Sequence, residues 1–207
     1  MQYQIIIINE SGKFGDVCLF QKDQVMHESS WKSLAWKTQM LTPEAKRVIS
    51  WNVEYSFNWS YLGDLSPLAK CLPAESIYAQ SGDTIRLGME SKIPNFTDQN
   101  GRGEMSKLEI AISEDIPNQR LSTGISMSGQ PCFIQKAIPG TNQKIILNPT
   151  YFLCFGNLEE STILGDEDLA DAIPVYFPPN VFTMYATLHP DNSWTLAINE
   201  PNLVSAS

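Results

Sequence analysis

The sequence predicts an all-β fold, an antiparallel two-sheet β-sandwich of about 12–14 short strands with little helix. Polar and apolar side chains alternate strictly through residues 51–61, WNVEYSFNWSY, and in a strand such alternation gives an aromatic face and a polar face. Short apolar segments also recur between turn signals, and very few segments have a helical period. With few helices to serve as crossovers, the strands must pair mostly antiparallel, and two stacked sheets would bury the aromatic face.

The other strands are expected where short apolar or alternating segments lie between Gly, Pro, Asn and Asp. They are residues 3–9, 16–21, 46–50, 76–80, 84–90, 108–113, 124–128, 131–137, 144–148, 151–156, 175–177, 181–188 and 194–199. The turn from Pro190 to Asn192 predicts a hairpin between the last two. Helical turns are expected only at 166–172 and 67–71. No repeat or linker divides the chain, so residues 1–207 are expected to form a single β-sandwich domain.

The composition is that of a packed globular protein, with 43% hydrophobic residues in a chain of 207. The formal net charge is −9, and the 14 Lys and Arg residues are scattered, which disfavours nucleic acid as a partner. No segment approaches the ~20 apolar residues that a membrane span requires. Residues 1–9 lack the basic and hydrophobic regions of a signal peptide. We therefore expect a soluble cytoplasmic protein, with non-classical export left open.

Four cysteines, Cys18, Cys71, Cys132 and Cys154, are widely spaced and form no C-x-x-C pair. Three of them lie in apolar, strand-like segments. Cysteines of this kind in a cytosolic protein usually behave as small buried hydrophobic residues. We expect free thiols, with a disulfide as the alternative.

No catalytic motif is found. The nearest match to the G-x-S-x-G nucleophile elbow lies at Gly124 to Gly129, but its second glycine comes one place late and no helix follows. The two histidines, His27 and His189, have no cysteine or carboxylate at ligand spacing. No spacing selects a pair of acids for glycoside chemistry. We therefore predict no catalytic residue.

Two acidic segments are candidates for calcium, and no other cofactor is predicted. In the first, Asp98, Asn100, Gly103 and Glu109 match positions 1, 3, 6 and 12 of the helix–loop–helix calcium loop. Arg102 takes the fifth position, where an oxygen ligand is required, so a solvated loop is the better interpretation.

The second acidic segment spans residues 159–171. A run of charges is usually a solvated face, and the alternative is a site for a divalent cation or a cationic partner. If calcium binds to this chain, Asp166, Asp168 and Asp171 are its first candidate ligands.

Trp31 and Trp36 lie outside the clearest strands and have two interpretations. Exposed indoles stack on sugar rings or anchor protein partners, so both are candidate ligand-binding residues. Their apolar neighbours Leu34 and Ala35 favour burial instead.

Several segments, taken together and in order, resemble the RhiA family of bacterial proteins, named for expression in the rhizosphere. They are residues 33–37 (SLAWK), 51–63 (WNVEYSFNWSYLG), 124–137 (GISMSGQPCFIQKA), 149–157 (PTYFLCFGN) and 175–196 (VYFPPNVFTMYATLHPDNSWTL). The resemblance implies a bacterial origin and an accessory role, linked to quorum-regulated life near a plant host. It carries over no activity, cofactor or functional residue. Residues 64–75 depart from the family pattern, which has a Val-Pro-Gly turn there.

The leading functional hypothesis is a non-enzymatic binding or interaction module whose loops recognise a small molecule, a glycan or a protein partner. One alternative is a self-assembling, abundant structural protein, which would be a homo-oligomer. The other is a hydrolase whose acid pair or cysteine is assembled only in the fold.

Overall fold

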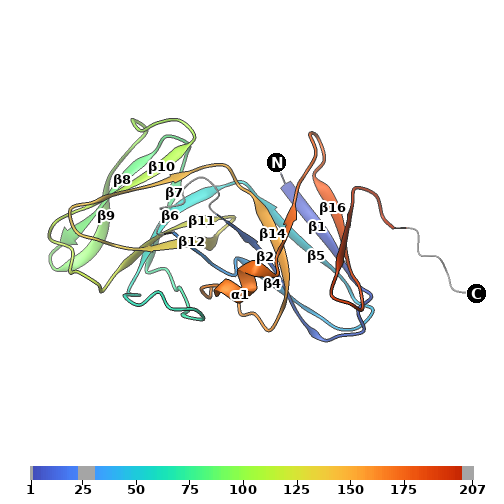
Figure 1. The fold of residues 1–207 in the computed structure, drawn as a ribbon. Coiled ribbons are helices and arrows are strands. Elements are labelled where there is room, and N and C mark those ends of the chain that lie inside the picture. Colours follow the sequence, from blue (N-terminus) through green and yellow to red (C-terminus); the bar gives the residue numbers. More distant parts are fainter. Residues whose placement is uncertain (1, 23–30, 202–207) are drawn as a thin grey trace, which may run out of the picture.

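The computed structural model describes residues 2–22 and 31–201 (Figure 1). These residues form seventeen strands and one short helix, so the predicted all-β class is confirmed. The elements are β1 (Gln2–Asn9), β2 (Gly15–Gln21), β3 (Lys32–Ser33), β4 (Lys37–Leu41), β5 (Lys46–Asn52), β6 (Tyr55–Ser60), β7 (Glu75–Ala79), β8 (Thr84–Glu90), β9 (Ile93–Asn100), β10 (Lys107–Ile112), β11 (Ser122–Met127), β12 (Gln130–Lys136), β13 (Asn142–Ile146), β14 (Tyr151–Gly156), α1 (Asp166–Ala170), β15 (Ile173–Val175), β16 (Thr183–Leu188) and β17 (Trp194–Ala197).

The described strands hydrogen-bond into four sheets. The β1 sheet has the order β17-β16-β1-β5, the β2 sheet β15-β14-β2-β4, the β8 sheet β13-β10-β8-β9 and the β11 sheet β3-β12-β11-β6-β7. Two pairs are parallel, β1 with β16 and β8 with β10, and antiparallel pairing dominates as predicted. The predicted two-sheet sandwich is not confirmed, because the strands divide among four sheets.

The four sheets are arranged as two pairs at opposite ends of the molecule (Figure 1). The β8 sheet packs on the β11 sheet, where the rings of Phe57 and Phe96 lie 6.4 Å apart. The β1 sheet packs on the β2 sheet, where the rings of Trp51 and Tyr151 lie 4.9 Å apart. The main cluster of buried apolar side chains contains residues from all four sheets, so the two pairs share a continuous core.

The alternating segment 51–61 is divided between two sheets, and the prediction of one continuous strand is wrong. Its first two residues belong to β5, which pairs with β1, whereas β6 pairs with β7 and β11. The chain changes partners at Val53 and Glu54, where the Glu54 carbonyl accepts a hydrogen bond of 2.9 Å from the Ser128 amide. Alternation in the sequence continues through this break because the large apolar side chains of both strands take odd-numbered positions. The polar side chains of Asn58 and Ser60 are buried as well, so β6 is covered on both faces.

Most of the predicted aromatic face is buried. Trp51, Phe57 and Trp59 are buried and Tyr55 is half-buried, but the Tyr61 side chain is 68% exposed. Tyr61 follows the end of β6, where the pleat no longer fixes the direction of its side chain.

Three strands, β3, β4 and β9, are not among those predicted, and β15 begins and ends two residues before the segment expected at 175–177. Strand β9 contains a proline, which argues against a strand when the sequence alone is considered. Its Asp98 also has a positive φ of 56°, which is unusual within a strand. The expected helical turn at 166–172 is present as α1, whereas residues 67–71 are not helical. The predicted hairpin is confirmed by the antiparallel pairing of β16 with β17.

Trp36 lies where three sheets meet. Its ring lies 5.7 Å from that of Trp51 on β5 and 6.2 Å from that of Tyr151 on β14. Its indole Nε1 donates a hydrogen bond of 2.9 Å to the carbonyl of Met127 on β11. The side chain is fully buried, so Trp36 joins the two ends of the core.

A methyl group at Gly124 of β11 should destabilise the protein. Its Cβ would overlap Asn58 Oδ1 and lie 2.6 Å from the Phe133 carbonyl oxygen. The same Asn58 donates a hydrogen bond of 2.8 Å to the Ser126 hydroxyl, which would have to move. Chemical denaturation of Gly124→Ala should show a free energy of unfolding lower by about 2 kcal/mol.

Gly156→Ala in β14 is the matched control, because its Cβ would meet only Leu158, at 3.9 Å. Its free energy of unfolding should stay within about 0.5 kcal/mol of the parent. Equal values for the two variants would contradict the close packing between β6 and β11.

Candidate functional site

Six aromatic side chains form one cluster between the β1 and β2 sheets. They are Tyr3, Trp36, Trp51, Tyr151, Phe177 and Phe182. Tyr3 of β1 stacks on its cross-strand neighbour Trp51 with ring centroids 5.9 Å apart and an interplanar angle of 16°. Phe177 meets the Tyr3 ring edge-on at 5.1 Å. Offset and edge-to-face pairs of this kind add to the energy of burial, so they stabilise the cluster.

A cavity of about 500 Å³ opens over one side of this cluster, and we call it the aromatic cavity. It is lined by Tyr3, Val53, Asn148, Pro149, Thr150, Tyr151, Val175, Tyr176 and Phe177. These residues come from β1, β14, β15 and three connecting segments. None of the lining residues is an acid, lysine, arginine, histidine or cysteine. The cavity therefore combines aromatic and apolar walls with the neutral polar groups of Asn148 and Thr150.

Two polar atoms next to the aromatic cavity have no hydrogen-bond partner among the described residues, Trp51 Nε1 and the Tyr151 hydroxyl. The two side chains are 2% and 6% exposed. Burial raises the pKa of Tyr151 to about 12, and the nearby Trp51 N–H lowers it by a smaller amount without reaching hydrogen-bond geometry. A buried polar group without a partner costs about 1–3 kcal/mol. Thr187 Oγ1, which does not line this cavity, is a third such atom among the described residues, so a missing partner is not specific to the aromatic cavity.

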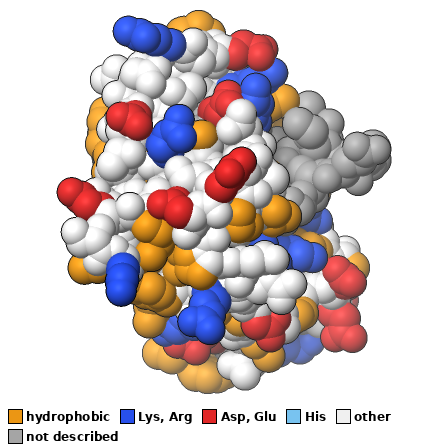
Figure 2. Space-filling view, turned by 90° about the vertical axis from the view of Figure 1, so that its left-hand side faces the viewer, with side chains coloured by type: hydrophobic (Ala, Val, Ile, Leu, Met, Phe, Trp, Pro, Cys, Tyr) orange, Lys and Arg blue, Asp and Glu red, His pale blue; other side chains and the backbone are white. Residues whose placement is uncertain are grey.

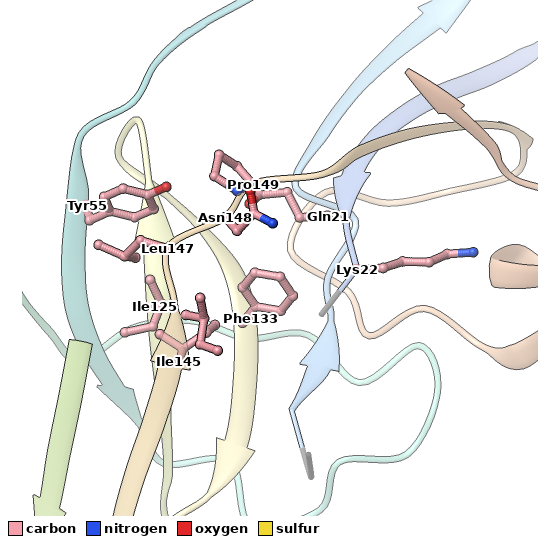
Figure 3. A pocket seen from close by; sticks show the side chains of 10 residues that line it. Gln21, Lys22, Tyr55, Ile125, Phe133, Ile145, Leu147, Asn148 and Pro149 are labelled. Atoms are coloured by element: carbon pink, nitrogen blue, oxygen red, sulfur yellow. The ribbon is translucent and has the colours of Figure 1, made fainter. Parts of the chain in front are cut away.

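A second, much smaller cavity lies behind the segment 147–149 (Figure 3). Its volume is about 20 Å³, enough for about one water molecule. It shares Asn148 and Pro149 with the aromatic cavity. Tyr55 and Phe133 face into it, whereas the Lys22 side chain points away (Figure 3), where its Nζ donates to the Leu169 carbonyl. This cavity is too small for an organic ligand.

Two further grooves are open and less specific. One, of about 460 Å³, is lined by Leu65, Ile138, two lysines and two polar residues of the 64–66 turn. The other, of about 580 Å³, contains Glu159 and Glu160, but Glu159 pairs with Lys70 and Glu160 accepts a hydrogen bond from the Thr38 amide. The charged side chains that line these two grooves are therefore already paired, hydrogen-bonded or exposed to solvent.

The two tryptophans singled out as candidate ligand-binding residues are both buried, at 9% exposure for Trp31 and 0% for Trp36. The indole of Trp31 donates a hydrogen bond of 2.9 Å to the carbonyl of Lys144, and Trp36 donates to Met127. Neither presents a free ring face at the surface. Trp36 nevertheless contacts Tyr151, which lines the aromatic cavity.

The candidate calcium ligands Asp166, Asp168 and Asp171 lie in and just after α1. Asp168 Oδ2 accepts a hydrogen bond of 2.9 Å from the Gly165 amide, at the N-terminus of the helix. Acidic side chains in a first turn are stabilised by the helix dipole. The described part of the chain contains no group of three or more His, Cys, Asp or Glu side chains arranged to hold a metal, so the structure does not bring these three carboxylates together. In the other calcium candidate, Asp98 lies near Arg86.

The histidine and serine candidates are used in structural contacts. His189 Nε2 lies 2.8 Å from the Thr195 hydroxyl across the β16–β17 hairpin, and His27 lies outside the described residues. Ser126, in the weak nucleophile-elbow match, is buried and accepts a hydrogen bond from Asn58. The strand expected there is present as β11.

All four cysteines are free and buried, as predicted. Burial raises the pKa of Cys71 to about 11, against a weaker lowering by the Ser60 hydroxyl, and burial also raises the pKa of Cys132. Thiols with raised pKa values are poor nucleophiles at neutral pH.

Basic and acidic side chains are interspersed on the face shown in Figure 2, and apolar side chains gather in its lower half. This face therefore carries no extended field of a single charge. The described residues include no helix with the length and apolar character of a membrane span.

Sequence reasoning missed the aromatic cavity. Five of its nine lining residues lie in two short segments that contain or precede a proline, 149–151 and 176–177. Both segments were among those that resemble the RhiA family. The sequence signal is a proline near each aromatic residue, two residues before Tyr151 and directly after Phe177, because proline is typical of strand ends.

Tyr151→Phe should leave the protein as stable as the parent or more stable, by up to about 1 kcal/mol, because it removes a buried hydroxyl without a partner. Ser122→Ala is the comparison, since that buried hydroxyl lies 2.7 Å from the Ser60 hydroxyl and its loss should cost about 1 kcal/mol. Urea denaturation of both variants checks the expectation. A loss of more than 1 kcal/mol in Tyr151→Phe would show that the hydroxyl is already satisfied.

Comparison with known proteins places the chain in a family. A sequence model of the RhiA family matches residues 1–199. The protein RhiA of Rhizobium leguminosarum bv. viciae is 27% identical over 211 aligned positions, which cover 94% of this chain and 86% of the relative. No solved structure matches. Since the family match extends from β1 through β17 and includes both segments that wall the aromatic cavity, the chain belongs to the RhiA family.

Proposed function

We propose that this protein is a non-enzymatic binding module that takes a neutral, ring-shaped small molecule in the aromatic cavity, with pyranose sugars the first class to test. The proposal rests on one observation, the two buried polar atoms without partners beside an uncharged, aromatic-lined cavity. Ligand sites are typically concave, mostly apolar and equipped with a few polar groups that fix orientation.

The chemistry of the lining favours a neutral ligand. An anionic ligand would lose hydration without gaining a partner of opposite charge. A pyranose ring has an apolar C–H face for the rings of Tyr176 and Tyr3. Its hydroxyls suit the side chains of Asn148 and Thr150. The aromatic cluster beneath is held by Trp36 and Trp51, so little ordering would be required on binding.

The same lining supports a binding role over a hydrolytic one. Acid–base or nucleophilic catalysis requires a carboxylate, histidine or cysteine within hydrogen-bond reach of the substrate. The lining of the aromatic cavity supplies none of these groups. In a bacterium, such a module would have an accessory role in rhizosphere or host association, which is the part of the proposal that rests on the family alone.

Thermal unfolding of the purified protein, with and without calcium, tests the proposal against neutral methyl pyranosides, neutral aromatic compounds and lipids. A ligand at about 100 times its dissociation constant stabilises the folded state by about 2.7 kcal/mol. A methyl pyranoside should raise the unfolding midpoint and change tryptophan fluorescence, because Trp51 lies under the cavity. Blank results with all three panels would contradict the binding proposal, and would direct attention to a protein partner or to self-assembly.

Two exposed tyrosines provide matched variants for any ligand found. Tyr176 lines the cavity and is 66% exposed, whereas Tyr78 of β7 is 58% exposed and lies in the other pair of sheets. Tyr176→Ala should weaken binding about tenfold by removing a stacking surface, and Tyr78→Ala should leave the affinity unchanged. If the two variants change the affinity equally, the ligand binds outside the aromatic cavity.

A further inference from the structure

Two of the four cysteines face each other across neighbouring strands. β2 and β14 pair antiparallel, and Cys18 is directly opposite Cys154 in their register. Residues opposite each other in an antiparallel pair have Cα atoms about 4.5–5.5 Å apart and side chains on the same face of the sheet. That separation lies within the range of about 4.4–6.8 Å spanned by disulfides. The backbone therefore already holds these two residues at bridging distance.

The other two cysteines have different neighbours. Cys132 Sγ donates a hydrogen bond of 3.1 Å to the Ile125 carbonyl. Cys71 belongs to a separate small cluster with Leu34 and Leu65, and its Sγ lies 4.0 Å from the Ser60 hydroxyl. Neither is opposite a cysteine in the described strand pairs, so register singles out one pair.

We propose that Cys18 and Cys154 form an oxidation site, at which exchange with a low-molecular-weight disulfide produces a cross-strand bridge between β2 and β14. One cysteine, as thiolate, attacks a sulfur of the added disulfide, which gives a mixed disulfide and releases one small thiol. The thiolate of the second cysteine then attacks the protein sulfur of that mixed disulfide and releases the second small thiol. Two protein thiols lose two protons and two electrons, and the small disulfide is reduced to two thiols.

The environment makes this exchange slow and dependent on pH. Both side chains are buried in strands at the centre of the β2 sheet, so a local opening must precede attack. The hydrogen-bonding contact with the Cys154 thiol, followed by burial, raises the pKa of Cys18. The thiolate is the reactive form, so the rate should increase as the pH rises from 7 to 9.

The test uses the full chain and oxidised glutathione as the oxidant. After incubation at pH 7 and at pH 9, the protein is denatured in the presence of iodoacetamide and its mass is measured. We expect a species in which only two of the four cysteines have accepted the reagent, and in which the protein part is about 2 Da lighter than the reduced chain because two thiol hydrogens are lost. Proteolysis should release a cross-linked peptide pair containing Cys18 and Cys154, which dithiothreitol separates.

Variants add an internal control. The Cys71→Ser variant should still form the bridge. The Cys18→Ser variant should instead retain glutathione on Cys154, because the second thiol that would displace it is absent. Because mapping is performed on the parent chain, the result does not depend on either variant folding. Four alkylated cysteines after prolonged incubation at pH 9, or a bridge that involves Cys71 or Cys132, would overturn the proposal.

Discussion

A hydrogen bond from the indole of Trp36 to the Met127 carbonyl joins the segment between β3 and β4 to the β11 sheet. The ring that makes this bond also contacts Trp51 of the β1 sheet and Tyr151 of the β2 sheet. One side chain thus connects three of the four sheets within a fully buried environment. Without it, the two pairs of sheets would share a less continuous core.

The aromatic cavity is a consequence of the same arrangement. Trp36 packs on Trp51 and Tyr151. These two rings pack in turn on Tyr3 and Phe177, so rings with few polar atoms fill the space between the β1 and β2 sheets. The Trp51 N–H and the Tyr151 hydroxyl are left without partners. The cluster is therefore incompletely hydrogen-bonded, and this is the feature on which the proposed binding function rests.

Much of the fold could be predicted from the sequence, since side-chain alternation reports the face of a strand. Residues 51–61 show the limit of that signal. Their alternation predicted burial of Trp51, Phe57 and Trp59. It could not show that the strand breaks at Val53 and joins a second sheet, because the large apolar side chains keep the same alternation on both sides of the break. Hydrogen-bond partners are set by contacts far apart in sequence, such as the parallel pairing of β1 with β16, and so the number of sheets was beyond prediction. The candidate site was missed for the same reason, since Tyr3, Tyr151 and Phe177 meet only in the fold.

The central position of Trp36 is tested most directly by measuring the free energy of unfolding of Trp36→Phe and of Trp31→Phe. Both indoles donate a hydrogen bond of 2.9 Å to a main-chain carbonyl, but only Trp36 joins three sheets. We expect Trp36→Phe to lower the free energy of unfolding by about 3 kcal/mol, because a hydrogen bond is lost and a space is left in the core. Trp31→Phe should lower it clearly less. Equal losses in the two variants, or a loss below about 1 kcal/mol for Trp36→Phe, would contradict the central position of Trp36.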